Sequence, residues 1–118
     1  MGFEEWLAFS ERDLSTAEYN LKGSKTDAAI FFCHQSVEKA LKALYIKKYG
    51  ELVKIHDLVI LGKKTNLPEE FIEFCKILSP AYVFTRYPDI EGRQGIDELA
   101  KEFIVKTRLV VEWVKKNL

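Results

Sequence analysis

Three polar residues on one predicted helix are the first candidates for chemistry. His34, Glu38 and Lys42 follow one another at intervals of four residues, so helical geometry places them along one side. An imidazole, a carboxylate and an ammonium group in a row could move protons or bind a polar ligand. The alternative is structural: His34 is a hydrogen-bonded histidine at the edge of the core, and Glu38 and Lys42 form an ion pair in solvent.

The other histidine, His56, follows this helix and directly precedes Asp57. Asp57 has the residue type and position of a helix N-cap, an interpretation we favour over a role as an acid catalyst. His56 could pack at the start of that helix or contribute a titrating group to a site.

A third candidate is the segment TRYPD at residues 85–89. Arg86 carries a planar guanidinium that matches phosphate or carboxylate, and Tyr87 carries a ring on which a base could stack. Pro88 moves Tyr87 away from the helical conformation, which predicts a loop. The alternative is that Arg86 bonds Asp89 or helix carbonyl groups while Tyr87 covers one end of the fold. Both interpretations stay open.

Motifs for several other kinds of chemistry are missing from the sequence. It contains no CxxC, no HExxH and no glycine-rich phosphate loop. The two histidines and two cysteines are not spaced as metal ligands, so we expect neither a metal nor a cofactor. Cys33 and His34 are neighbours on a helix, where their side chains point about 100° apart and cannot form a catalytic pair. We expect Cys33 and Cys75 to be buried free thiols.

Five helices must position these residues. Apolar periodicity predicts helices over residues 3–22 and 28–49, a short helix that begins at Asp57, a fourth that begins at Pro68, and a last one from about residue 96 to 117. We expect Gly23 to be a left-handed cap, Gly50 to end the second helix, Gly62 with the polar residues 63–66 to close the short third helix, and the pair Ser79–Pro80 to end the fourth. No segment alternates long enough to predict a strand. The sequence therefore predicts one all-α domain over residues 1–118, an up-and-down bundle of four main helices plus a short fifth.

Length and composition limit the possible functions. A chain of 118 residues supports one core, and its 18 basic residues balance its 18 acidic residues. This balance argues against nucleic-acid binding through bulk charge, though not against a local basic groove. The apolar runs are too short to span a membrane, and Glu4 and Glu5 do not fit a signal peptide. We expect a cytoplasmic protein that does not bind membranes.

The last predicted helix carries two apolar stripes. One contains Phe103 and Val110, and the second contains Val105, Leu109 and Trp113. A helix that packs on one side only needs a single stripe. We therefore expect the last helix to form the contact of a homodimer as well as part of the bundle.

Several segments together resemble prokaryotic HEPN domains of the type associated with nucleotidyltransferases or found at the end of the chaperone sacsin. They are CHQSVEKALKAL at residues 33–44, Gly50, HDL at residues 56–58 and RYPD at residues 86–89. The resemblance extends from about Trp6 to Trp113. It implies an all-α bundle that commonly dimerises, in agreement with the helical pattern.

The resemblance also implies a function. Some HEPN proteins are the helical partner of a minimal nucleotidyltransferase, often in toxin–antitoxin modules. By this resemblance, we expect a non-enzymatic homodimer that binds nucleotide or nucleic acid. The expected binding residues are His34, Glu38, Lys42, His56, Arg86 and Tyr87.

Two alternatives remain. Other HEPN proteins are metal-independent RNases, marked by an arginine four to six residues before a histidine. Residues 27–29 before His34 and residues 49–51 before His56 include no arginine, which argues against that activity. An RNase could still use a histidine as acid–base group and Arg86 or Arg93 to stabilise phosphate charge. The other alternative is a purely architectural dimer that recruits a protein.

Overall fold

The computed structural model describes residues 2–52, 54–84 and 95–118, and for residues 82–84 only the backbone. These residues form five α-helices and no strand, which confirms the predicted all-α bundle of four long helices and a short one. The helices are α1 (Phe3–Lys22), α2 (Thr26–Tyr49), α3 (Leu58–Lys64), α4 (Glu69–Phe84) and α5 (Ile96–Asn117). None of the helices within the described ranges is long and apolar enough to cross a lipid bilayer.

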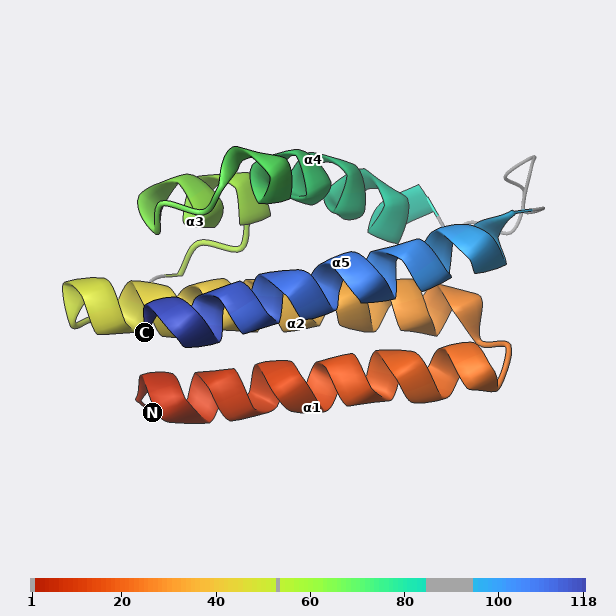
Figure 1. Cartoon of the computed structure of the whole chain (residues 1–118), viewed down its shortest axis with the longest axis horizontal. Coiled ribbons are helices and arrows are strands. Elements are labelled where there is room, and N and C mark those ends of the chain that lie inside the picture. Colours follow the sequence, from red (N-terminus) through yellow and green to blue (C-terminus); the bar gives the residue numbers. More distant parts are fainter. Residues whose placement is uncertain (1, 53, 85–94) are drawn as a thin grey trace.

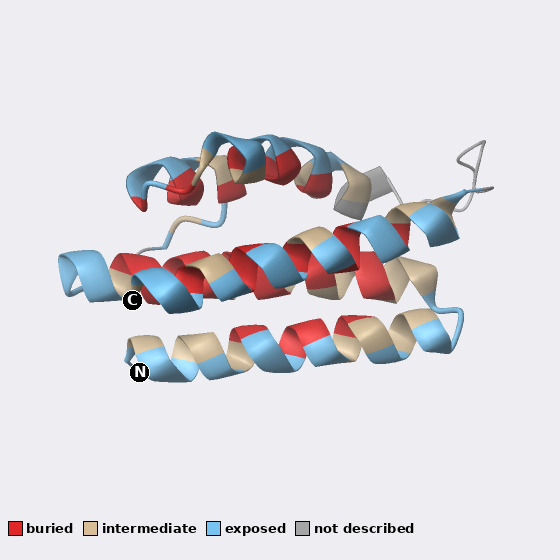
Figure 2. Ribbon diagram, viewed as in Figure 1, coloured by how far each residue is buried: buried red, intermediate tan, exposed pale blue. Residues whose placement is uncertain are grey.

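Helix α2 is the centre of the bundle, because it packs against all four other helices. Helices α1 and α2 are antiparallel, and α5 lies along both (Figure 1). On the other side, α3 and α4 both contact α2, and α4 also contacts α5. Buried residues follow α2 and the inward faces of its neighbours (Figure 2). A charged residue in the middle of α2 therefore has little access to water unless it lies at a gap between two neighbouring helices, whereas the last turn of α2 is exposed.

Small residues let α1 approach α2 closely. Ser10 Oγ donates a hydrogen bond to the Ser36 carbonyl at 2.7 Å, and Ser36 Oγ donates to the Ser10 carbonyl at 2.8 Å. Both serines are fully buried, so these bonds satisfy hydroxyl groups that have no access to water. The reciprocal pair fixes the register in which α1 meets α2.

The predicted turns agree with the structure at Gly50 and Asp57 but not at Gly23. Gly50 ends α2 in the left-handed conformation with φ 73°, and Asp57 Oδ1 accepts a hydrogen bond from the Ile60 N–H at 3.0 Å. Gly23 has φ −84°, so the prediction of a left-handed glycine there was wrong. Ser24 takes the left-handed position instead, with φ 61°. The turn is one residue longer than expected, because the Lys25 N–H bonds back to the Asn20 carbonyl at 2.7 Å.

One predicted helix end was also wrong. Helix α4 continues through Pro80, which lies inside it. Proline removes the bond to the Lys76 carbonyl, but both residues are exposed and water can replace it. Helix α3 ends at Lys64, within the predicted closing segment 62–66, so Gly62 lies inside its last turn. Gly62 is buried where α3 meets α4, and a Cβ there would lie 2.6 Å from Ile72 Cδ1.

Cys33 and Cys75 are buried free thiols, as predicted. Burial raises the pKa of each thiol to about 12. Both side chains are therefore neutral core residues at ordinary pH.

Candidate functional site

Glu38, Lys42 and His56 meet at a single carboxylate oxygen, and we refer to these three residues as the α2 triad. Glu38 Oε2 lies 2.9 Å from Lys42 Nζ, which donates to it, and 3.0 Å from His56 Nδ1. Lys42 Nζ also lies 3.2 Å from His56 Nδ1. His56 Nδ1 has two possible roles: with a hydrogen it donates to Glu38, and without one it accepts from Lys42.

Local structure brings the three residues together. Glu38 and Lys42 are one turn apart on α2, as the helical spacing predicts. Gly50 turns the chain back at the end of α2, and Asp57 caps α3 directly after His56. Because both ends of this connection are fixed, His56 returns to the side of α2 that Glu38 and Lys42 occupy.

Burial separates the roles of the triad residues. Glu38 is 8% exposed and Lys42 is 4% exposed, so the interpretation of a solvated pair was wrong. A neighbouring helix face covers Lys42: its Nζ lies 5.6 Å from the centre of the Trp6 ring on α1. The His56 side chain, by contrast, is 75% exposed. A ligand would therefore meet the His56 ring first, with the buried ion pair behind it.

His34 lies on the same side of α2, one turn before Glu38, and is buried. Burial lowers its pKa below the usual 6.5, and the negative charge of Glu38 partly offsets this effect. His34 is therefore a neutral imidazole at neutral pH. Its link to the triad is the electrostatic interaction with Glu38. Its burial fits a position at the edge of the core, and the ring hydrogen bond of the structural interpretation stays a prediction.

Arg86 and Tyr87, together with Arg93, lie outside the described residues, so this part of the predicted site stays a prediction. The helix ends on either side of them are described: α4 ends and α5 begins at the end of the bundle where α2 begins (Figure 1). Lys42 is 16 residues after the first residue of α2, a separation of about 24 Å along a helix. The triad is thus remote from those two helix ends.

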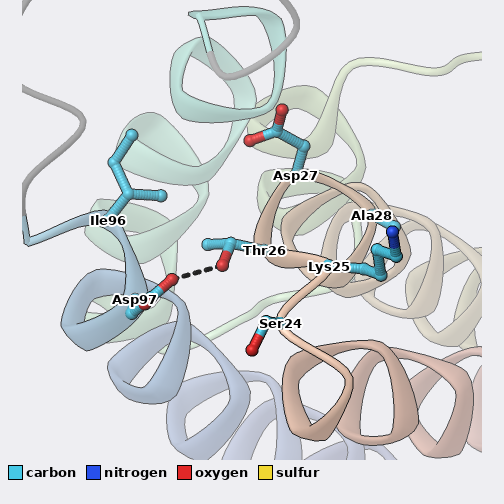
Figure 3. Close-up of a pocket in the computed structure, with 7 residues that line it drawn as sticks. All are labelled: Ser24, Lys25, Thr26, Asp27, Ala28, Ile96 and Asp97. Atoms are coloured by element: carbon cyan, nitrogen blue, oxygen red, sulfur yellow. Dashed lines mark hydrogen bonds between the residues drawn. The ribbon is translucent and has the colours of Figure 1, made fainter.

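A cavity of about 430 Å³ lies at that end of the bundle, between the α1–α2 turn and the start of α5 (Figure 3). Thr26 Oγ1 donates a hydrogen bond to Asp97 Oδ1 and so ties the start of α2 to the start of α5. Lys25 and Asp27 also line the cavity, and of the predicted binding residues that the structure describes, His34, Glu38, Lys42 and His56, none lines it. Acidic residues in the first turn of a helix stabilise its dipole, so a structural role accounts for both aspartates.

Within the described ranges, no three His, Cys, Asp or Glu side chains are grouped so that they could hold a metal ion. The ionisable groups of the α2 triad comprise a single carboxylate, a single imidazole and an ammonium group. Their arrangement suits binding of a polar ligand, or proton transfer by His56 with Glu38 orienting its ring.

Trp6 is the residue near the site that sequence reasoning missed. Trp6 shares the apolar face of α1 with Phe3 and Leu14, and this spacing by itself indicates only a core residue. The contact with Lys42 connects two helices, so no local spacing could have shown it. By comparison, the stacking of Arg12 over the Phe9 ring at 4.5 Å joins residues three apart and follows from helical spacing.

The chain is similar in sequence and in structure to known helical proteins. The family model described as HEPN domain matches residues 3–117. The structure of ST0689, an archaeal HEPN homologue, is similar to this chain with a TM-score of 0.79 and 29% identity, covering 99% of this chain and 98% of that one. TT1696 from Thermus thermophilus is similar with a TM-score of 0.81 and 25% identity, covering 98% of both chains. None of the curated proteins compared with the chain matches it.

Proposed function

This chain belongs to the HEPN domain family, and we propose that it is a non-enzymatic binding module. It forms a homodimer, binds a nucleotide or nucleic acid at the α2 triad, and partners a minimal nucleotidyltransferase in a module of the toxin–antitoxin type. The observation that carries the ligand-binding part is the contact between buried Glu38 and exposed His56 at 3.0 Å.

The triad can supply donors to a phosphate. When His56 is protonated, Nδ1 donates to Glu38 and the Nε2–H remains to donate to a ligand. Lys42 donates one N–H to Glu38 and its Nζ lies 3.2 Å from His56 Nδ1, so its positive charge lies directly behind the His56 ring. The Trp6 ring beside Lys42 adds an aromatic surface of the kind on which bases stack. A phosphate beside a flat aromatic group fits this combination, and a nucleotide has both.

The exposed face of α5 supports the homodimer. Val105 is 53% exposed and Leu109 is 52% exposed, and Trp113 continues their stripe. Glu102 and Lys116 each lie seven residues from Leu109 and therefore close to the same line along the helix. If a second copy of α5 packs antiparallel about Leu109, Glu102 of each copy meets Lys116 of the other.

The nucleotidyltransferase partner and the toxin–antitoxin role rest on the resemblance of residues 33–44, 56–58 and 86–89 to HEPN proteins of that type. Co-expression of the chain with a minimal nucleotidyltransferase from the same genome tests this part. Co-purification at a fixed ratio supports it, and separation of the two proteins on a sizing column contradicts it.

RNase activity is the second candidate function. An exposed imidazole oriented by a carboxylate is a suitable acid–base group, and His56 with Glu38 has this arrangement. His34 is a poor candidate for the same role because burial lowers its pKa and excludes it from solvent.

One experiment addresses both functions. The melting temperature of the purified chain is measured against a panel of nucleotides, and cleavage of single-stranded RNA in EDTA is assayed on the same sample. A ligand that binds only the folded state raises the melting temperature. We expect a shift with one nucleotide class, no cleavage, and loss of the shift in His56→Ala.

Lys54→Ala is the matched control, because Lys54 is exposed in the same connection. A shift that persists in His56→Ala contradicts the triad site. Cleavage of RNA that disappears in His56→Ala supports the RNase instead.

A further inference from the structure

A separate cavity of about 430 Å³ lies at the end of the molecule away from the Thr26–Asp97 contact. It is bounded by the last turns of α2 and α5 and by the turn that follows α3. Its polar lining comprises Lys47, Lys48, Thr65, Asn66 and Asn117, and Trp113 provides an aromatic wall. We refer to it as the C-terminal cavity; it contains no residue of the α2 triad.

Among the described residues that line the C-terminal cavity, Lys47 and Lys48 are positively charged and no side chain is acidic; Leu44 and Leu118 complete the lining. Across the described part of the chain, no carboxylate lies within ion-pair distance of Lys47 or Lys48. Cations along the middle of the helices are different: Lys39, Lys106 and Arg108 each pair with a carboxylate. The cavity therefore presents two cations whose charge the described carboxylates leave uncompensated.

Favourable interaction with the helix dipole explains part of this pattern. Basic residues occupy the last turns of α2, α3 and α5, where cations stabilise the negative end of a helix. That effect requires only that lysines be near helix ends. The dipole effect does not explain why the ends of α2, α3 and α5 border a common cavity. It also does not explain why the described residues that line this cavity include no Asp or Glu.

Contacts with the protein hold both ammonium groups. Lys47 Nζ lies 4.8 Å from the centre of the Phe3 ring, and Lys48 Nζ donates to the Lys64 carbonyl at 3.2 Å. These contacts restrict two long side chains before any ligand arrives, which lowers the entropy cost of binding. Each ammonium group has three donors, so it can add a bond to an anion while it keeps its present contact.

We propose that the C-terminal cavity binds a nucleoside phosphate, either free or as the end of an RNA chain. Lys47 and Lys48 bind the phosphate, and the Trp113 ring stacks on the base. The volume lies within the usual range for small-molecule sites. The class of ligand rests on the proposed function, but the C-terminal cavity is a second site, on another side of α2 from the α2 triad. Because Trp113 also ends the exposed stripe of α5, the cavity borders the proposed dimer contact.

The emission of Trp113 gives a readout local to this cavity. The chain has two tryptophans, so the Trp6→Phe variant reports Trp113 alone. This variant is titrated with AMP, ADP, adenosine and inorganic phosphate, and with a short RNA that has either a 5′-phosphate or a 5′-hydroxyl. We expect AMP and ADP to change the emission at lower concentrations than adenosine or phosphate. A preference for the phosphorylated RNA over free AMP identifies an RNA end as the ligand.

Two double variants with equal loss of charge test the lysines in the Trp6→Phe background. Lys47→Gln with Lys48→Gln removes the cations of the cavity, and we expect the Kd for ADP to rise at least about tenfold, the loss expected for one charge-assisted contact. Lys63→Gln with Lys64→Gln removes two lysines that end α3 but do not line the cavity. We expect its Kd to change less than about threefold, the screened effect of exposed charge that does not line the cavity. Circular dichroism confirms that each variant is folded.

Three results would overturn the inference. The first is no change in Trp113 emission with any probe. The second is an equal loss of affinity in both double variants, which would indicate bulk charge only. The third is a nucleotide-dependent rise in the melting temperature of the natural chain without a Trp113 signal in the Trp6→Phe variant, which would leave the proposed function intact and place the ligand elsewhere.

Discussion

Lys42 Nζ lies 2.9 Å from Glu38 Oε2, and both residues are almost completely buried on the central helix. Transfer of each charge out of water is costly, so each depends on the other for compensation. His56 and the Trp6 ring complete their surroundings. Through these contacts the ion pair on α2 is joined both to α1, at Trp6, and to the connection before α3, at His56.

Removing either charge of this pair should destabilise the fold strongly. We expect Glu38→Gln or Lys42→Met to lower the free energy of unfolding by about 3–5 kcal/mol, because the remaining charge is buried without compensation. The double variant Glu38→Leu with Lys42→Met should cost less than the sum of the singles. Urea unfolding measures all three variants. Additive losses, or single losses below about 1 kcal/mol as for surface pairs, would contradict this view of the pair.

His34 should make stability depend on pH. Burial lowers its pKa in the folded state below 6.5, and the charge of Glu38 opposes but does not cancel this effect. The unfolded chain therefore binds more protons, so stability is full above about pH 6.5 and is lost as pH falls below that value toward the folded pKa. Urea midpoints between about pH 7.5 and 5.5 measure the loss.

His34→Gln removes this titration, and we expect a flatter stability profile over the same range. His56→Gln is the matched control because it removes the exposed histidine instead. If His56→Gln flattens the profile and His34→Gln does not, the assignment to His34 is wrong.

Gly62→Ala should destabilise the contact between α3 and α4. The added methyl would lie 2.6 Å from Ile72 Cδ1 and 3.1 Å from Leu67 Cδ2. Ile72 is 2% exposed and has little room to move, so we expect a cost of about 1–3 kcal/mol from overpacking, reduced by up to about 1 kcal/mol of helix propensity.

Ile72→Val removes the Cδ1 atom and supplies the control. The double variant Gly62→Ala with Ile72→Val should be more stable than Gly62→Ala alone, because the clashing atom is absent. Thermal unfolding of the three variants measures this coupling. A Gly62→Ala protein as stable as the natural chain would show that Ile72 repacks freely.

The α5 face should determine the oligomeric state. We expect a dimer in solution, and Leu109→Glu should convert it to a monomer because it places a charge at the centre of the proposed contact. Ile77→Glu on α4 is the control, since Ile77 is 50% exposed and Leu109 52% exposed. Light scattering after size exclusion measures both variants. A monomeric natural chain, or dissociation by Ile77→Glu alone, rules out this interface.

Charge reversal tests the antiparallel register of the two α5 helices. Glu102→Lys or Lys116→Glu alone should weaken the dimer through like-charge contacts with the second copy, and the two changes together should restore it. The dimer dissociation constant of each variant is the measured quantity. If the double variant is weaker than both singles, the α5 helices do not pair about Leu109.

Much of the helical architecture could be predicted because its causes are local. The bounds of α1 and α5 follow from apolar periodicity, and Gly50 and Asp57 mark a helix end and a helix start through their own backbone and side-chain chemistry. The membership of the HEPN family was also readable, since it depends on sequence segments alone. The same spacing placed Glu38 and Lys42 on one side of α2.

Tertiary contacts decided the rest. Pro80 stays within α4 because the packing of that helix stabilises it by more than the loss of one exposed hydrogen bond costs. Position 62 of α3 is a glycine because α4 packs too closely there to leave room for a side chain. The sequence could not show that Glu38 and Lys42 are buried, that His56 returns to them, or that Trp6 covers Lys42. It also could not show that Lys47, Lys48 and Trp113 line one cavity. Periodicity fixes the direction of a side chain from its own helix, but burial and partners depend on which other helices arrive there.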